Sequence, residues 1–333
     1  MWINVLYLNT QDIETLGIDW NKTIEVIEQA VHALHLGDFD QPIKPYLRYN
    51  DLNNRIIAMP AYIGGNTNFA GIKWISSFPN NIHQGMKRAH SVTILNHSET
   101  GKPLAFFNTA LISGVRTASV SGLMIKYFDK SRLLQDITVG IIGFGPIGQL
   151  HLNMINSLLG DRISEIILYD LEGIKPELIS YELKDRVIIA ESWEEAYSNA
   201  DIFITCTVSS SRYVDKEPKG NSLLLNVSLR DFQPSILNYT NSIIVDEWEE
   251  VCRENTDIEL MYKTRGLQKE NTYSIIDVVC NNQMERLPLK EAIMFNPMGM
   301  AIFDIAIAAF YYKGAMSNGV GTILEEDSLS LLP

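Results

Sequence analysis

An apolar, β-branched run that ends in a glycine-rich turn sets the fold class of this 333-residue chain. The run covers residues 137–142, and the turn Gly-Phe-Gly-Pro-Ile-Gly at 143–148 leads into a helix-like segment. Such a turn lets backbone N–H groups approach a pyrophosphate at the positive end of a helix. It therefore predicts a dinucleotide-binding fold, although a glycine turn in an unrelated α/β protein is the alternative. The predicted cofactor contacts in this turn are Gly143, Gly145, Pro146, Ile147 and Gly148.

A second predicted strand ends in Asp170, which lies 22 residues after Gly148. An acid at this place can accept hydrogen bonds from an adenosine ribose, and it would repel a 2′-phosphate. Asp170 therefore favours NAD over NADP as the cofactor.

From residue 137 onward, short apolar runs alternate with helix-like segments. Continuous Ile/Val/Leu runs are typical of parallel strands that are buried on both faces. The predicted strands are 137–142, 165–170, 187–190, 201–208, 222–228 and 242–247. This pattern predicts a doubly wound parallel sheet of the Rossmann type. Residues at the ends of two of these strands are expected to line the cofactor groove: Thr207, Val208, Ser209 and Ser228.

The glycine turn starts late in the chain, so a region of domain size precedes it. That region predicts a helix at 23–37, several short alternating runs that favour an antiparallel α+β fold, and a second helix at 111–127. A long apolar helix follows residue 300, and we expect it to be buried between domains or subunits and to return to the first domain. The predicted domains are thus 1–115 plus 300–333, a substrate-binding and dimerisation domain, and 116–299, the NAD-binding domain.

Composition excludes several classes of function. The formal net charge is −13, which disfavours binding to nucleic acid or to anionic membranes. The three cysteines show no disulfide or zinc spacing, and the histidines show no metal pattern, so no metal is expected. No apolar run reaches the length of a membrane span, and the N-terminus reads as a strand, so the predicted location is the cytoplasm.

An anionic substrate needs fixed cations, and the first domain offers Arg48, Lys73, Arg88 and Arg116. Two of these cations and one acid lie where they could carry chemistry. Lys73 is flanked by apolar residues in a strand-like segment and could bind a substrate carboxylate, or it could point outward from an edge strand. Arg116 lies near the start of a helix, where an anion is also favoured, although a surface arginine is equally compatible. Asp231 follows a strand end and could transfer protons, or it could be a solvated loop residue or a helix cap.

The order of these motifs resembles the ornithine cyclodeaminase/μ-crystallin family. The segments that carry the resemblance are Gly71-Ile-Lys-Trp, Leu111-Ile-Ser-x-x-Arg-Thr-Ala, Gly143-Phe-Gly-Pro-Ile-Gly and Asn296-Pro-Met-Gly-Met-Ala. The resemblance implies a Rossmann domain inserted in a discontinuous, dimer-forming domain, with a small amino-acid-derived substrate in a cleft between them. It also implies roles for particular residues. Those expected to bind substrate are Arg48, Met59, Lys73 and Arg116; the expected catalytic residues are Lys73 and Asp231; Met298 and Gly299 are expected near the nicotinamide.

Within the family, the segments 55–60 and 295–301 are most similar to the N-((2S)-2-amino-2-carboxyethyl)-L-glutamate dehydrogenases of 2,3-diaminopropionate biosynthesis. This likeness implies oxidation of a secondary amine, hydrolysis of the imine to 2,3-diaminopropionate and 2-oxoglutarate, and release of NADH, in a pathway that feeds siderophores. Ornithine cyclodeaminases usually carry a Glu where this chain has residues 56–58, so cyclisation of ornithine is disfavoured. Asn108 and Phe303 also replace family acids. Ornithine cyclodeaminase, ketimine or imine reductase and alanine dehydrogenase-like activities remain alternatives, as does a non-enzymatic ligand-binding role.

Overall fold

The computed structural model describes residues 4–325 and divides into two compact units. Unit 1 comprises Met1–Arg116 and Met300–Pro333, and unit 2 comprises Thr117–Gly299. Helix α3 (Leu111–Arg132) starts in unit 1 and continues into unit 2. No described helix is both long and apolar enough to cross a bilayer.

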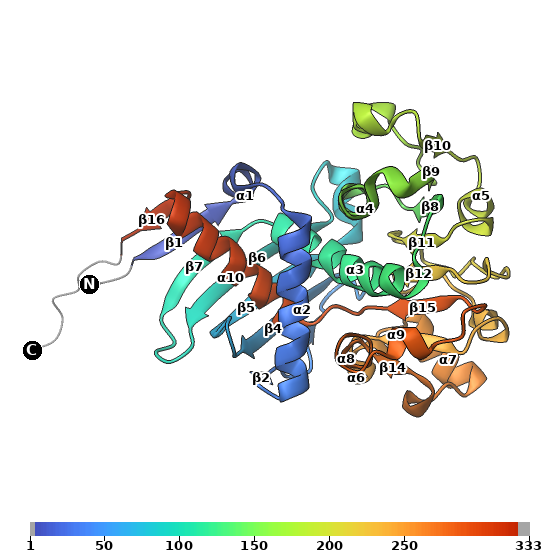
Figure 1. The fold of residues 1–333 in the computed structure, drawn as a ribbon. Helices are drawn as coiled ribbons and strands as arrows, with labels where there is room; N and C mark the ends of the chain where they lie inside the picture. The colour runs from blue at the N-terminus through green and yellow to red at the C-terminus, as the bar shows by residue number, and fades with distance from the viewer. Residues whose placement is uncertain (1–3, 326–333) are drawn as a thin grey trace, which may run out of the picture. The chain divides into compact units, whose positions relative to one another are not determined.

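Unit 1 is built on one mixed sheet (Figure 1). Its elements are β1 (Val5–Asn9), α1 (Thr10–Leu16), α2 (Trp20–Leu36), β2 (Phe39–Asp40), β3 (Tyr46–Leu47), β4 (Arg55–Ile63), β5 (Phe69–Ser77), β6 (Ala89–His97), β7 (Pro103–Asn108), α10 (Ala301–Asn318) and β16 (Thr322–Leu324). The strand order is β16-β1-β7-β6-β5-β4-β2, and β3 also pairs with β4. The expectation of an antiparallel sheet is wrong at one place, because β1 runs parallel to β7. Hairpins fix the direction of consecutive strands only, and β1 and β7 are joined by a long connection instead.

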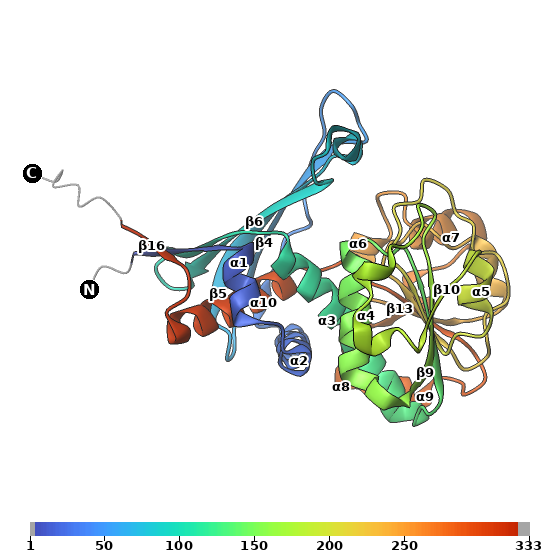
Figure 2. The same cartoon turned by 90° about the horizontal axis from the view of Figure 1, so that it is seen from above.

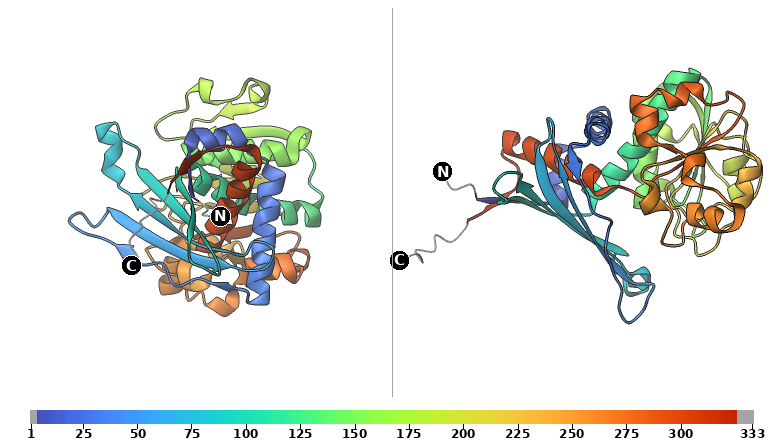
Figure 3. Two further views of the ribbon diagram at one scale, coloured as in Figure 1. Left: turned by 90° about the vertical axis from the view of Figure 1, so that its left-hand side faces the viewer. Right: turned by 90° about the horizontal axis from the view of Figure 1, so that it is seen from below.

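Helix α10 packs on one face of the unit 1 sheet, and α2 packs against α10 (Figure 3). The covered face carries the row Met59, Lys73 and Thr93, which are paired across β4, β5 and β6. Gly71 allows α10 to approach closely, because a Cβ at this position would lie 2.8 Å from the Ile305 side chain. The long C-terminal helix is therefore buried as predicted, and its packing partners are elements of its own unit.

Unit 2 is a parallel sheet with helices on both faces, as the alternation of strand and helix patterns predicted. Its strands are β8 (Ile137–Ile142), β9 (Ile163–Tyr169), β10 (Val187–Ile189), β11 (Ile202–Thr205), β12 (Leu223–Asn226), β13 (Ser242–Val245), β14 (Tyr273–Ser274) and β15 (Ile293–Asn296). Its helices are α4 (Pro146–Leu159), α5 (Trp193–Ser198), α6 (Trp248–Val251), α7 (Asp257–Arg265), α8 (Ile275–Cys280) and α9 (Gln283–Arg286). Figure 2 shows α4 and α5 on opposite faces of the sheet.

The strand order in unit 2 is β10-β9-β8-β11-β12-β15-β13-β14. The direction of strand addition reverses between β8 and β11, and the carboxyl ends of strands at such a switch point are where ligands bind in open α/β sheets. The glycine turn follows β8, and the segment that starts at Cys206 follows β11. The sheet therefore brings two of the predicted cofactor segments to one edge.

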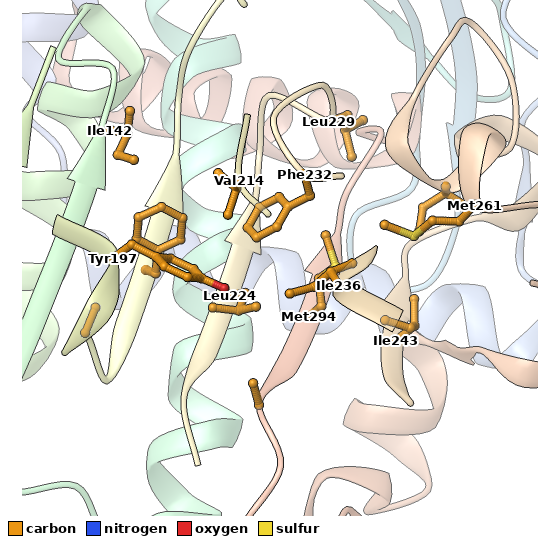
Figure 4. Packing of buried hydrophobic residues seen from close by; sticks show 14 of the residues in the cluster. Ile142, Tyr197, Val214, Leu224, Leu229, Phe232, Ile236, Ile243, Met261 and Met294 are labelled. Carbon is orange, nitrogen blue, oxygen red and sulfur yellow. The ribbon is translucent and has the colours of Figure 1, made fainter. Parts of the chain in front are cut away.

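A buried cluster holds the carboxyl half of unit 2 together. Figure 4 shows Val214, Leu229 and Phe232 among the side chains of this cluster. A parallel bridge joins Val214 to Phe232, so the loop after β11 and the loop after β12 lie side by side. This packing fixes the backbone on both sides of Asp231.

Candidate active site

Lys73 lies at the centre of a buried charge cluster in unit 1. Its strand, β5, is paired on both sides by β4 and β6, so the alternative of an edge strand with an outward lysine is wrong. The Lys73 side chain is 2% exposed. Its Nζ donates to Asp304 Oδ2 at 2.7 Å and to Ser113 Oγ at 3.2 Å. Asp304 comes from α10, so the returning C-terminal helix supplies the counter-charge.

Arg116 shares the same carboxylate. Its Nε donates to Asp304 Oδ1 at 2.9 Å, and the residue is buried. The terminal NH1 and NH2 groups of Arg116 make no ion pair or hydrogen bond with residues 4–325. These groups form the guanidinium edge that binds a carboxylate in bidentate geometry. The Nε of Arg116 is therefore bound to Asp304, and its terminal groups are available to bind a carboxylate.

The cluster shifts the protonation equilibria of its members. Burial lowers the pKa of Lys73 to about 7, Asp304 opposes this shift, and the charges of Arg116 and Lys44 add to it. Although burial favours the protonated form of Asp304, Arg116 and Lys73 hold its pKa below the ordinary value. One carboxylate thus balances two buried cations, which leaves room for a second anion.

Lys44 was not predicted, whereas Arg48 was. Lys44 is 3% exposed and acts electrostatically on Lys73. Arg48 donates to the Leu52 carbonyl at 2.8 Å, and its guanidinium lies 5.5 Å from the Tyr46 ring centroid. The contacts described for Arg48 thus lie in its own loop. Sequence pattern cannot separate these two cations, because both lie in irregular chain before β4.

The glycine turn has the geometry that a dinucleotide requires. Gly143 has a φ of +85°, and a Cβ there would lie 2.6 Å from the Cys206 backbone. A Cβ at Gly148 would lie 2.1 Å from the Gly143 carbonyl oxygen, so this glycine permits close packing of helix and strand. Gly145 is the N-cap of α4, and a Cβ there would meet nothing within 4 Å. The open space at Gly145 and the helix N-terminus beside it fit a pyrophosphate.

Asp170 lies beside this turn. Its Oδ2 accepts from the Phe144 N–H at 2.6 Å, and its Oδ1 accepts from the Glu172 N–H at 3.0 Å. The predicted ribose ligand is thus tied to the turn that would hold the pyrophosphate. Pro146 occupies the first turn of α4, and Ile147 follows it half-buried.

The other predicted cofactor residues of unit 2 fall into two groups. After β11, Thr207 accepts from the Ser209 N–H at 3.2 Å, and Val208 is 68% exposed. Ser228 Oγ bonds Thr205 Oγ1 at 2.9 Å, which joins the ends of β11 and β12.

Asp246, which the sequence analysis missed, fixes the segment that contains Met298 and Gly299. Its carboxylate accepts from the Met298 N–H at 3.0 Å and from the Gly299 N–H at 2.6 Å. Gly299 has a φ of +84°, which explains the glycine. Asp246 directly follows the end of β13, a position that could have drawn attention to it.

Asp231 is buried, so the alternative of a solvated loop residue is wrong. Its Oδ1 accepts from Thr207 Oγ1 at 2.5 Å, whereas its Oδ2 is buried without a hydrogen bond among the described residues. Burial raises the pKa of Asp231 to about 6, against the lowering effects of the Thr207 and Tyr213 hydroxyls. A carboxylate with one bound and one unused oxygen and a pKa close to neutrality suits general acid–base chemistry.

Asp257 holds the backbone at Asp231 in place. Its Oδ2 accepts from the backbone N–H groups of Asp231 and Phe232 at 3.1 and 3.0 Å, and from Asn226 Nδ2 at 3.0 Å. Its Oδ1 accepts from Arg212 Nε at 2.6 Å. Burial raises the pKa of Asp257, and these hydrogen bonds oppose the shift. No sequence motif marks Asp257, so it could not be predicted.

Cys206 has a histidine neighbour that its sequence surroundings did not reveal. His151 Nδ1 lies 3.8 Å from Cys206 Sγ and 2.8 Å from the Ile147 carbonyl oxygen. Burial lowers the pKa of His151 to about 4, and burial also raises the pKa of the Cys206 thiol. The pair is therefore neutral and does not provide a thiolate nucleophile. Among residues 4–325, no group of three or more His, Cys, Asp or Glu side chains could hold a metal ion.

A family model described as the ornithine cyclodeaminase/mu-crystallin family matches residues 6–319. The chain belongs to this family. An N-((2S)-2-amino-2-carboxyethyl)-L-glutamate dehydrogenase from Staphylococcus aureus is 34% identical over 341 residues, which cover 96% of this chain and 98% of the relative. The resemblance inferred from the motifs is therefore confirmed.

Two further relatives carry related names. An alanine dehydrogenase from Archaeoglobus fulgidus is 28% identical over 330 residues, with 96% of this chain and 98% of the relative covered. The solved structure of the Thermococcus litoralis Δ(1)-pyrroline-2-carboxylate reductase in complex with NADH and L-proline has a TM-score of 0.84 and 24% identity, with 96% and 100% of the chains covered. The fold prediction is confirmed, and the names agree with the prediction of an oxidoreductase.

Proposed function

We propose that this protein is an NAD-dependent oxidoreductase that oxidises an amino-acid-derived secondary amine, N-((2S)-2-amino-2-carboxyethyl)-L-glutamate. Hydrolysis of the resulting imine gives 2,3-diaminopropionate and 2-oxoglutarate. The overall balance is substrate, NAD⁺ and water to the two products, NADH and a proton. The Staphylococcus aureus relative carries the name of this activity.

The observation that carries the proposal is the free guanidinium edge of Arg116 beside Lys73. A substrate carboxylate that binds this edge completes the charge balance of a cluster in which one acid, Asp304, serves two buried cations. Bidentate pairing fixes the orientation of the carboxylate and so holds the substrate in one position. In this proposal Met59, opposite Lys73 on β4, packs against the apolar part of the substrate.

The open approach to Gly145 and the position of Asp170 support NAD as the cofactor. When bound, NAD supplies a hydride acceptor. The proposed contacts are the glycine turn, Asp170 and the strand-end residues described above, with Met298 and Gly299 held by Asp246 on the nicotinamide side.

Asp231 moves the protons in the proposed reaction. Its unused Oδ2 takes the proton from the substrate nitrogen as the α-carbon loses hydride and the C=N bond forms. The carboxylate passes this proton to solvent, which accounts for the proton in the overall balance. Water then adds to the imine carbon, and one of its protons passes through the carboxylate to the nitrogen. The carboxylate next takes the proton of the new hydroxyl group and gives it to the nitrogen as the C–N bond breaks and the C=O bond forms, which restores the ionised acid.

The residues of unit 1 favour ornithine less as a substrate. Ile57 lies on the same face of β4 as Met59, because the two are two positions apart along the strand. The family cyclodeaminases carry a Glu in this region to face the substrate amine, and an isoleucine cannot pair with an ammonium group. The apolar Ile57 therefore favours a substrate without a distal amine at this place.

The reaction can be tested directly with purified protein, substrate and NAD. We expect one NADH, measured at 340 nm, for each 2-oxoglutarate formed, and loss of both in Asp231→Asn with NAD affinity retained. Ammonia and proline from ornithine without net NADH would instead identify a cyclodeaminase. NAD(P)H consumption with an imine or with an oxo acid and amine, and no reaction in the oxidative direction, would identify a reductase.

We also propose that the protein forms a homodimer through the open face of the unit 1 sheet. Among residues 4–325 of unit 1, no helix covers this face (Figure 3). It carries an apolar row across five strands: Pro60, Ile72, Ile94, Phe106 and Tyr7. Trp74, on the same face, is 42% exposed. Exposed apolar surface of this extent is typical of a subunit interface. Trp74→Glu should shift the mass measured by light scattering from dimer to monomer, and an unchanged mass would refute this interface.

A further inference from the structure

A second cationic site lies on the unit 1 sheet beyond Lys73. Arg55 starts β4 and lies on the same face as Met59, because strand side chains alternate with a period of two. Arg55 pairs with Ser77, which is four residues from Lys73 along β5. Arg88 immediately precedes β6, whose Ala89 pairs with Ser77. Arg55 thus lies at the end of the face whose centre holds Lys73, and Arg88 leads into a strand at the same end of the sheet.

These arginines have no counter-charge within the part of the chain that the structure describes. The side chains of Arg55 and Arg88 form no ion pair with any residue between 4 and 325, and Arg55 Nε is buried without a hydrogen bond. Burial lowers the pKa of Arg88, and the charge of Arg55 lowers it further, so the two guanidinium groups repel each other. Two half-buried like charges without an acid between them are stabilised when an anion binds.

Unused hydroxyl groups connect this pair to the Lys73 cluster. Ser91 and Thr93 are 6% and 0% exposed and lie on the covered face of β6, and neither Ser91 Oγ nor Thr93 Oγ1 has a hydrogen-bond partner among the described residues. Thr93 pairs with Lys73, and Ser91 lies one pair closer to Arg88. Buried polar atoms are nearly always hydrogen-bonded, so a row of unused ones indicates a ligand.

The dimensions fit an elongated substrate. Four residues of strand separate Arg55 from the level of Lys73, a span of about 13 Å between backbone positions. Long arginine and lysine side chains can shorten this span considerably. The terminal carboxylates of the proposed substrate are separated by seven bonds, which is slightly more than two extended residues or about 8 Å.

We propose that Arg55 and Arg88 bind the side-chain carboxylate of the substrate, while Arg116 and Lys73 bind a carboxylate at its other end and the Ser91 and Thr93 hydroxyls line the path between them. The two cationic sites select an elongated amino-acid derivative with carboxylates at both ends. This inference rests on the proposed function for the identity of the substrate, but the two-site selection itself does not require turnover.

The test compares binding of two ligands by calorimetry without NAD. The ligands are N-((2S)-2-amino-2-carboxyethyl)-L-glutamate and its side-chain amide, in which glutamine replaces glutamate. The variants are Arg55→Met, Arg88→Gln and, as a matched control, Lys87→Gln, which removes the charge of an exposed neighbour. Losing a hydrogen bond to a charged group should weaken binding of the tricarboxylate by about 10- to 100-fold. Binding of the amide should change less than about 3-fold, and Lys87→Gln should bind both ligands as the wild type does.

Two outcomes would overturn the inference, and a third would separate it from the proposed reaction. Equal weakening for both ligands would overturn the inference, because Arg55 and Arg88 would then act on the fold and not on the distal carboxylate. Unchanged binding in the arginine variants would overturn it as well. The third outcome is that the wild type binds the tricarboxylate more tightly than the amide, that the arginine variants lose this preference, and that no NADH forms in the kinetic assay. This outcome would support the two-site selection and refute the proposed reaction.

Discussion

Asp304→Asn tests whether one carboxylate holds the buried cation cluster together. Asp304 is 2% exposed and lies 2.7 Å from Lys73 Nζ and 2.9 Å from Arg116 Nε. At an effective dielectric constant of about 20, each contact is worth about 6 kcal/mol of Coulomb attraction before the cost of burying the charges. Asparagine keeps the shape and removes the charge, which leaves two buried cations without an acid. We therefore expect the free energy of unfolding to fall by about 3–5 kcal/mol.

The loss should depend on pH in a defined direction. The pKa of Asp304 lies below the ordinary 3.8, so the acid stabilises the fold above this value, and its contribution is lost as pH falls through its folded pKa. The difference between wild type and variant should therefore shrink in acid. Because Asp304 raises the pKa of Lys73, the variant should also shift that pKa below about 7. Carboxylate binding by the variant should then weaken at neutral pH and recover in part near pH 6.

Urea unfolding followed by circular dichroism, at several pH values, measures the first effect, and ligand titration measures the second. Glu285→Gln is the control, because Glu285 pairs with Lys130 at 3.8 Å and both side chains are exposed. Such a pair should contribute no more than about 1 kcal/mol. A loss below about 1 kcal/mol in Asp304→Asn, or a difference that persists unchanged at low pH, would show that Asp304 does not carry the cluster.

Three further predictions follow from the site geometry. Gly145→Val should weaken NAD binding more than about 10-fold with an unchanged melting temperature, since a Cβ there meets no protein atom within 4 Å; a stable variant with normal affinity would place the pyrophosphate elsewhere. Tyr213→Phe should raise the pKa of Asp231, because the hydroxyl lowers it, and should move the acid limb of the pH–rate profile upward. Tyr197→Phe, which removes a buried hydroxyl bonded to the Lys216 carbonyl, should leave that limb in place, and equal profiles in both variants would refute the assignment. Substrate binding at pH 8 should take up close to one proton, because a bound carboxylate raises the pKa of Lys73 from about 7; calorimetry in two buffers of different ionisation enthalpy measures this uptake, and equal heats would contradict it.

Local pattern was sufficient for most of the strands of unit 2. The continuous apolar runs at β8, β9 and β13 specify strands that are buried on both faces, and the structure contains each of them. Pattern failed for β15, a four-residue strand that ends at the Asn of the Asn-Pro-Met-Gly segment and pairs between β12 and β13. Insertion of a late strand between two earlier ones is a property of the sheet, and no local period reports it.

The site residues likewise divide into those that local pattern determines and those that depend on the whole fold. Gly143 and Asp170 were predictable because one turn and one strand end determine their geometry. Asp257 was not, because its four hydrogen-bond partners lie between 25 and 45 residues away. The role of such a residue depends on which loops the fold brings together, and a single sequence does not report that.

Asp304 shows how a site could be predicted further than it was. The segment from Ala301 to Ala309 is apolar except for this one acid, and a helix of that kind must be buried. A buried carboxylate is costly unless a cation pairs with it, so a lone acid in an apolar helix predicts a cationic partner on the surface that the helix covers. Alternation along β5 then selects Lys73, which shares a face with Gly71, the residue whose missing side chain admits α10. The glycine and the acid are therefore two parts of one packing requirement, and together they specify the position of the buried lysine.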